Sequence, residues 1–194
     1  MIYRIIKRLF DFLGALLGLI VLSPLFIIVA ILVKLNSPGP IFFKQERYGK
    51  DEKIFKFWKF RTMKTGSENL PYSVEQLREF ESSDNDPRLN KIAGFLRKYA
   101  LDEIPQLINI LKGDISFVGP RAYFKKRIEN DERLKQRLKV KPGLTCLAVL
   151  KGGVQLSEEE LLKLDLEYIN KQNFFLDIKI LLKSIFLVIS GQGF

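Results

Sequence analysis

An uncharged apolar stretch over residues 12–33 constrains the fold of this chain more than any other feature. As one straight helix it would measure about 33 Å at 1.5 Å per residue, which is enough to cross the hydrocarbon core of a bilayer. The stretch is too long for the apolar core of a secretory signal, and no small-residue cleavage site follows it. The sequence therefore predicts a permanent membrane element, with the lipid bilayer as a partner.

Charge and a central Ser23-Pro24 pair indicate how this element meets the bilayer. Cytoplasmic flanks collect Lys and Arg, so a spanning helix shows a bias between its two ends. Here both flanks are basic: Arg4, Lys7 and Arg8 precede the stretch, and Lys34, Lys44, Arg47, Lys50 and Lys53 follow it. Pro24 removes a backbone hydrogen bond, and Ser23 can bind a freed carbonyl. We expect a re-entrant helix-hairpin over residues 1–36; one spanning helix with an internal proline is the alternative.

Asp11 lies close to the start of the apolar stretch, beside Arg4, Lys7 and Arg8. An acidic side chain near a membrane is stabilised by a cationic partner. We therefore expect Asp11 to form an ion pair at the interface rather than to be buried alone.

Composition narrows the chemistry that the remainder can perform. A length of 194 residues suits one domain. The chain has no histidine, which excludes an imidazole base and histidine-containing metal sites. Its one cysteine, Cys146, excludes an internal disulfide and a cysteine zinc cluster. The net charge of +10 favours anionic partners, namely phospholipid, nucleic acid or phosphorylated substrates, without choosing among them.

The pattern after residue 36 predicts an α+β fold that is mainly helical. Residues 41–48 and 54–63 alternate like two short strands around a turn at 49–52. We expect a helix over residues 92–99, a strand at 115–118, and a highly charged, solvated helix over 123–139. An apolar segment follows at 144–150, and a Ser157 capping box predicts a helix that runs to about residue 171. The last element is an amphipathic helix over 174–189, which lies either in the core or at the membrane interface. Residues 65–90 form a polar excursion, ordered or mobile.

Residues 54–61 combine aromatic and cationic side chains, a pattern that also occurs where bases stack on a protein. Bulky side chains beside a membrane entry point are more often core packing or an interfacial belt. We therefore expect no nucleic-acid partner.

The strongest candidate for chemistry is the adjacent pair Asp102 and Glu103, just before Pro105. The apolar residues that follow have the spacing of one helix face, and they are Ile104, Leu107, Ile108 and Leu111. Proline is favoured at the first helical position, and Gly113 is placed to end the helix. The positive end of the helix dipole favours ionised carboxylates there. Such carboxylates ligate Mg²⁺ or attack an electrophile, although capping the helix is the simpler explanation.

Several of these stretches together resemble the bacterial sugar transferase family, the monotopic phosphoglycosyl transferases. The most specific is residues 101–121, which contains Asp102-Glu103-Ile104-Pro105 and Gly119-Pro120-Arg121. The others, in order, are Lys7-Arg8-x-x-Asp11, Ser23-Pro24, residues 37–49, residues 57–63, Asp86-Pro87-Arg88, Leu96-Arg97 and Pro142-Gly143-Leu144-Thr145. The resemblance covers nearly the whole chain.

The resemblance implies a small catalytic domain over residues 37–194, with interfacial helices, on the cytoplasmic face of the bacterial inner membrane. Such enzymes move a phospho-sugar from a UDP-sugar to polyprenyl phosphate and release UMP. Asp102 would be the nucleophile that forms a covalent phospho-sugar intermediate, and Glu103, with Asp102, would hold Mg²⁺. The remaining site residues implied are phosphate contacts: Arg97, and less directly Lys59, Arg61 and Arg121. A homo-oligomer is left open.

One segment departs from the family pattern. After Thr145 the family usually continues with glycine, two residues, glutamine, two residues and Gly-Arg, whereas this chain has Cys146, Val149 and Gly152-Gly153. We expect altered recognition of the donor sugar, with Cys146 as a packing residue. The alternative function is a membrane-anchored basic adaptor without catalysis.

Overall fold

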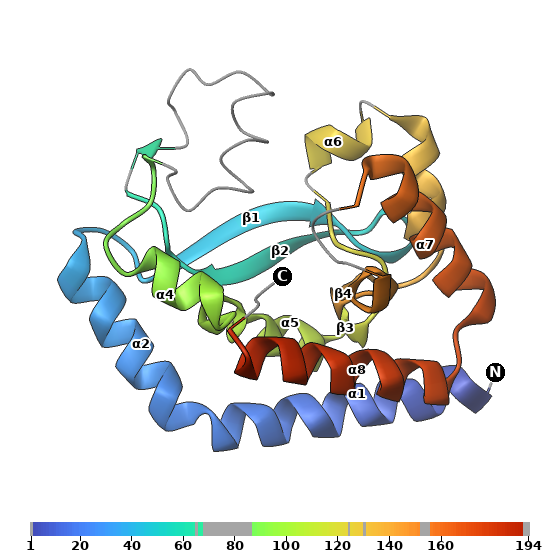
Figure 1. The fold of residues 1–194 in the computed structure, drawn as a ribbon, viewed down its shortest axis with the longest axis horizontal. Coiled ribbons are helices and arrows are strands. Elements are labelled where there is room, and N and C mark those ends of the chain that lie inside the picture. The colour runs from blue at the N-terminus through green and yellow to red at the C-terminus, as the bar shows by residue number, and fades with distance from the viewer. Residues whose placement is uncertain are drawn as a thin grey trace.

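The computed structural model describes residues 2–64, 66–67, 87–123, 125–129, 131–151 and 156–191. Most of the polar excursion, with Asp86, and the Gly152-Gly153 pair lie outside the described residues. The elements, shown in Figure 1, are mainly helices with two small sheets: α1 Ile2–Val21, α2 Ser23–Asn36, β1 Phe42–Tyr48, η1 Lys50–Glu52, β2 Ile54–Phe60, α4 Ala93–Lys98, η3 Leu101–Glu103, α5 Gln106–Lys112, β3 Ser116–Val118, α6 Lys125–Glu129, η4 Glu132–Lys139, β4 Gly143–Thr145, η5 Leu147–Lys151, α7 Glu158–Lys171 and α8 Phe174–Ile189.

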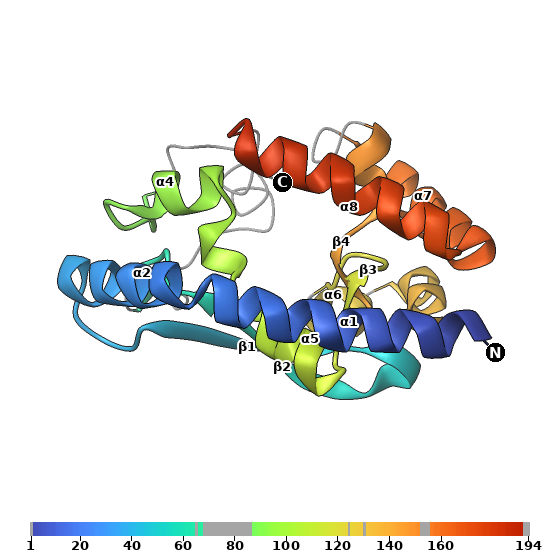
Figure 2. The same cartoon turned by 90° about the horizontal axis from the view of Figure 1, so that it is seen from below.

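The apolar N-terminal stretch forms two helices that meet at an angle of 64°. The Ser23 hydroxyl donates to the Ile20 carbonyl at 2.8 Å. Pro24 occupies the first turn of α2, where a backbone N–H would have no partner within the helix, so the missing N–H of proline costs nothing there. The predicted break at Ser23-Pro24 is confirmed. In the described part of the chain no single helix is long and apolar enough to cross a membrane, whereas α1 and α2 together meet both criteria. Figure 1 shows the bent pair along the edge of the molecule, and in Figure 2 the helices α4, α7 and α8 are drawn above it and the β1–β2 hairpin below it.

Both ends of the bent pair are bonded to the rest of the protein. Near the start of α1, Arg8 donates to the Ile110 and Leu111 carbonyls at 2.7 and 2.8 Å. After α2, the Ser37 carbonyl accepts a hydrogen bond from Arg61 at 2.6 Å. The α1–α2 pair is therefore attached at both ends to the part of the protein that follows residue 36.

The prediction that Asp11 forms an ion pair at the membrane interface is wrong. Asp11 is buried and accepts hydrogen bonds from the Ser116 hydroxyl and the Phe117 amide, at 3.0 and 3.1 Å. Its neighbour Lys7 instead pairs with Asp177 of α8 at 2.6 Å. The reason is that α1 lies against β3, so the face that carries Asp11 meets protein rather than water.

The two predicted strands form an antiparallel hairpin in which Phe42 pairs with Phe60 and Tyr48 with Ile54. The second strand stops at Phe60, three residues earlier than expected. Its buried aromatic rings, Phe55, Phe57 and Phe60, join the main core with residues of α1, α2 and α5. The packing explanation for this aromatic run is thus confirmed.

The single solvated helix expected over residues 123–139 is wrong. The segment contains a short helix, α6, and a 3-10 helix, η4, which begins after Asp131 caps the Arg133 amide at 3.0 Å. Ile128, Leu134 and Leu138 are buried around Tyr123 in a second core. The buried apolar residues are few and are divided between two short elements. The many charged residues around them give the segment the appearance of one solvated helix in the sequence.

The C-terminal elements match their predictions. The Ser157 capping box is present at the start of α7, and Asn173 caps α8. β3 pairs with β4 in parallel, and the strands approach so closely that a Cβ at Gly143 would overlap the Gly119 backbone. α8 buries Asp177, Ile180 and Ser184, and leaves Phe175 and Leu182 exposed. It therefore contributes to the core and also exposes an apolar face.

Candidate active site

Asp102 and Glu103 lie on a 3-10 turn, η3, between α4 and α5. Ala100 begins this turn in the left-handed conformation, with φ of 49°, which is strained for a residue with a side chain. Pro105 adopts a helical φ of −61° immediately before α5, and Gly113 ends that helix in the left-handed conformation. The predicted helix and its stop are confirmed, and the carboxylates lie one turn before its start.

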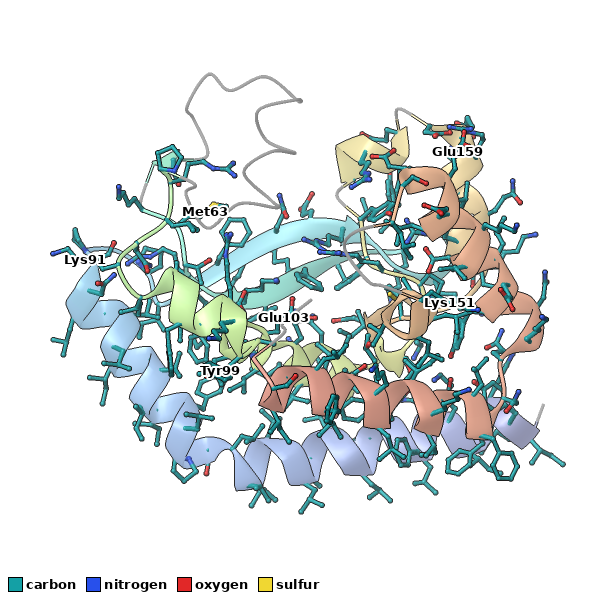
Figure 3. All side chains as sticks on the ribbon, in the orientation of Figure 1. Met63, Lys91, Tyr99, Glu103, Lys151 and Glu159 are labelled. Carbon is teal, nitrogen blue, oxygen red and sulfur yellow. The ribbon has the colours of Figure 1, made fainter. Side chains whose placement is uncertain are left out.

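Lys59 of β2 bridges the two carboxylates. Its ammonium nitrogen lies 2.5 Å from Glu103 Oε1 and 3.4 Å from Asp102 Oδ2. The Asp102 side chain is 6% exposed and that of Glu103 is 22% exposed, so the pair is largely shielded from water. Figure 3 shows Glu103 near the centre of the molecule, between β2 and α8. The structure thus brings together three residues that the resemblance had singled out.

The two carboxylates have opposite electrostatic environments. Burial raises the pKa of Asp102, and the neighbouring Glu103 charge adds to this, while Lys59 and Arg97 oppose it. Burial also acts on Glu103, but Lys59, Arg121 and Arg47 together hold its pKa below the usual range. The helix dipole alone predicts two ionised groups. The tertiary surroundings instead shift the two pKa values apart, so that Asp102 is easier to protonate than Glu103.

Two further predicted residues lie within electrostatic reach of the pair. Arg97, half-buried on α4, acts on Asp102, and Arg121, exposed after β3, acts on Glu103. Arg121 is held through its backbone: its carbonyl accepts from Arg137 at 3.0 Å, and its amide donates to Asp165. Arg137 and Asp165 form an ion pair whose side chains are 3% and 4% exposed. This buried pair therefore fixes where Arg121 stands.

Arg61 is used differently from the other predicted phosphate contacts. It is buried and donates to the Ser37 and Pro38 carbonyls, at 2.6 and 2.8 Å. Through these bonds the Arg61 side chain holds the linker between α2 and β1 against the end of β2.

Sequence reasoning missed Asn109, which is fully buried in α5. Its side chain accepts from the Trp58 amide at 3.1 Å and donates to the Lys56 carbonyl at 2.8 Å, so it joins α5 to β2. Lys59 follows one residue after Trp58, so Asn109 fixes the lysine relative to the carboxylates. The available signal was a lone amide within the apolar run from Leu107 to Leu111.

The donor set suits a hard cation that also binds a phosphorylated ligand. Mg²⁺ is commonly held by one or two carboxylates together with substrate phosphates. Asp102 and Glu103 are adjacent and supply oxygen ligands of this kind. Among the described residues no cluster of three or more acidic, cysteine or histidine side chains could hold a metal without such a ligand.

A family model described as bacterial sugar transferase matches residues 2–191. The match includes the bent helix pair, the carboxylates and α8. The chain belongs to the bacterial sugar transferase family.

Three relatives illustrate the range of this sugar transferase family. The UDP-glucose:undecaprenyl-phosphate glucose-1-phosphate transferase of Escherichia coli (strain K12) is 39% identical over 94% of this chain and 40% of the relative. The UDP-N-acetylgalactosamine-undecaprenyl-phosphate N-acetylgalactosaminephosphotransferase of Aeromonas hydrophila is 35% identical over 99% and 45%. The exopolysaccharide production protein ExoY of Rhizobium meliloti is 36% identical over 96% and 87%. The chain therefore spans less than half of the first two relatives.

The departure of this chain from the family pattern lies in described residues at Cys146 and Val149. Val149 is buried in η5, and Cys146 is half-buried. Burial raises the pKa of the Cys146 thiol, which disfavours the reactive thiolate. Both features support the interpretation of Cys146 as a packing residue.

Proposed function

We propose that this protein is a phosphoglycosyl transferase that moves a phospho-sugar from a UDP-sugar to polyprenyl phosphate. The observation that carries the proposal is the arrangement of Lys59 across Asp102 and Glu103. It places the shielded carboxyl group of Asp102 beside the Lys59 ammonium group and beside Glu103, whose pKa is lowered. The names of the relatives support a UDP-sugar donor and an undecaprenyl-phosphate acceptor.

The transfer occurs in two displacements at one phosphorus atom. A carboxylate oxygen of Asp102 attacks the phosphorus that carries the sugar, and the bond to the uridine-bearing phosphate breaks, so that UMP leaves with the bonding electrons. An oxygen of polyprenyl phosphate then attacks the same phosphorus. The acyl-phosphate bond breaks, and the Asp102 carboxylate is restored. No histidine base is needed, because the acceptor phosphate is already ionised.

The surrounding cations suit this chemistry. Lys59, Arg97 and Arg121 offer positive charge to the diphosphate, and the planar arginine groups match phosphate oxygens. When bound by Glu103 and Asp102, Mg²⁺ would offset the charge of the diphosphate. The protein itself holds Lys59 in place through Asn109, and Arg121 through the Arg137–Asp165 pair.

We place α1 and α2 in the cytoplasmic face of the bacterial inner membrane, as a re-entrant hairpin. Two observations support this placement. Both ends of the pair are bonded to the same body, through Arg8 and Ser37. The outer faces are apolar and exposed, with Leu17 62% and Leu35 80% exposed to the surroundings. An exposed apolar surface of this kind suits contact with lipid.

The test is a search for the covalent intermediate. Purified protein receives Mg²⁺ and a panel of UDP-sugars without acceptor lipid, and intact mass is measured. We expect a phospho-sugar adduct on the natural protein and on Asp51→Asn, a surface control, and none on Asp102→Asn. Absence of an adduct and of UMP release with acceptor across a wide donor panel would reject the proposal and favour the adaptor.

A further inference from the structure

A cationic cavity lies away from the carboxylate pair, at the N-terminal end of α1. Its volume is about 160 Å³, comparable with a cavity of about 150 Å³ that holds benzene in another protein. Its walls come from α1, η1, β3, α7 and its following residue Gln172, the end of η4 and the segment after η4. Six cationic side chains line it: Arg4, Lys7, Arg8, Lys50, Lys139 and Lys141.

Part of this charge is already used by the protein. Lys7 pairs with Asp177 at 2.6 Å, and Lys50 pairs with Asp51 at 3.2 Å. Arg8 donates to the carbonyls at the end of α5. The one carboxylate among the described lining residues is Asp11, and one of its oxygens accepts two protein hydrogen bonds.

The remaining cations form no ion pair with the part of the chain that the structure describes. No carboxylate of the described residues lies within ion-pair distance of Arg4, Lys139 or Lys141. Arg8 and Lys141 converge on one point, since a Cβ at Gly113 would lie 3.1 Å from Arg8 Nη2 and 3.2 Å from Lys141 Nζ. Burial, and then the charge of Arg8, lower the pKa of Lys141, although the carboxylates of Asp11 and Asp114 oppose this shift. An anion in the cavity would relieve this repulsion.

The position of the cavity indicates the source of the anion. Arg4, Lys7 and Arg8 line it, while Ile5 and Leu9 on the same helix are 64% and 57% exposed. The cavity therefore borders the apolar face that we place in the membrane, at the level where basic side chains meet lipid phosphates. We infer that it binds the phosphodiester headgroup of an anionic phospholipid. This site is separate from the carboxylate pair and does not require the transfer reaction.

The test uses the full chain in nonionic detergent micelles at constant ionic strength. The micelles are doped with phosphatidylglycerol or, at the same mole fraction, phosphatidylcholine; a third sample receives inorganic phosphate. We expect phosphatidylglycerol alone to raise the unfolding midpoint, by about 5 °C when it is well above its dissociation constant. A Lys139→Gln/Lys141→Gln variant should bind about tenfold more weakly and lose most of the shift.

The matched control, Lys91→Gln/Lys163→Gln, removes the same charge at exposed positions; Lys91 lies at the far end of the molecule (Figure 3). It should keep the full shift, as should Lys141→Arg, which retains the cation. Without lipid, the cavity variant should unfold no earlier than the natural protein, because it removes repulsion. Equal shifts in the cavity variant and the natural protein, or with the two lipids, would overturn the site. An equal shift with inorganic phosphate would overturn its assignment to a lipid.

Discussion

The ammonium group of Lys59 lies 2.5 Å from the carboxylate of Glu103, across 44 residues of sequence. Lys59, together with Arg121 and Arg47, holds the pKa of Glu103 below its usual range, whereas burial raises the pKa of its neighbour Asp102. Two identical functional groups, one residue apart, thereby receive different roles. In the proposed reaction Glu103 would be the held anion and Asp102 the nucleophile that forms the covalent intermediate.

Asp102→Asn should abolish adduct formation and at the same time stabilise the protein. The folded-state pKa of Asp102 is raised, so its contribution to stability is present at low pH and is lost as the pH rises through that pKa. At neutral pH the ionised group is a cost, and the neutral isostere removes it. We expect the unfolding midpoint to rise by about 3 °C at pH 7 and to change little at pH 3, as measured by calorimetry. A lower midpoint at pH 7 would contradict this account.

Lys59→Met should lower kcat/KM by about 100-fold and move the acidic limb of the pH–rate profile upward. The reason is that Lys59 opposes the effect of burial on both carboxylates. Lys59→Arg keeps the charge and should retain more activity. Lys56→Met, an exposed lysine of the same strand, is the matched control and should leave the profile unchanged. An unshifted acidic limb in Lys59→Met would show that the lysine does not set the ionisation of the pair.

Arg137→Met should destabilise the protein by about 3–5 kcal/mol, because the buried Asp165 loses its cationic partner and keeps only the hydrogen bond from the Arg121 amide. The double variant Arg137→Met/Asp165→Leu should recover most of that stability. It should not recover activity, because Arg121 loses both backbone bonds. Kinetics and thermal unfolding of both variants provide the measurement. Full activity in the stable double variant would show that the buried pair serves the fold alone.

The same pair predicts a pH dependence of stability. Burial raises the pKa of Asp165 to about 6, against the opposing effect of Arg137. Since the folded-state value exceeds that of the unfolded chain, the contribution of Asp165 is present below about pH 4 and is lost as the pH rises through 6. Asp165→Asn should therefore flatten the stability profile between pH 4 and 6. A slope in Asp165→Asn equal to that of the natural protein would exclude this group as its cause.

Single cysteines at Ile2 and Pro40, in a Cys146→Ser background, should be labelled from the same side of sealed vesicles. Both positions are exposed: Ile2 is the first residue of α1, and Pro40 follows α2, and both ends of this helix pair are bonded to one body. Pro24→Ala restores a backbone donor at the bend and should shift some molecules to a spanning state. Opposite accessibility of the two cysteines in the unmodified hairpin would reject the re-entrant arrangement.

The sequence by itself determined the elements whose causes are local. The apolar stretch with Ser23-Pro24 predicts a broken helix, and the Ser157 capping box predicts the start of α7; both follow from neighbours within one or two turns. The order of motifs around Asp102 and Glu103 also sufficed to identify the family and the candidate carboxylates. Where the local pattern was weak, as in the charged segment over 123–139, the prediction of one helix was wrong.

Only the tertiary structure decided how the candidate residues work. The ionisation of Asp102 and Glu103 depends on burial and on Lys59, which reaches them from a distant strand. The position of Arg121 depends on Arg137 and Asp165, and that of Lys59 on Asn109. Asp11 lies near three cations in the sequence, yet it accepts hydrogen bonds from Ser116 and Phe117 of β3. The reason is that the packing of α1 against β3 turns this face of the helix toward protein. Such contacts form between segments that are far apart in the chain, so they could not be predicted from the spacing of residues along the sequence.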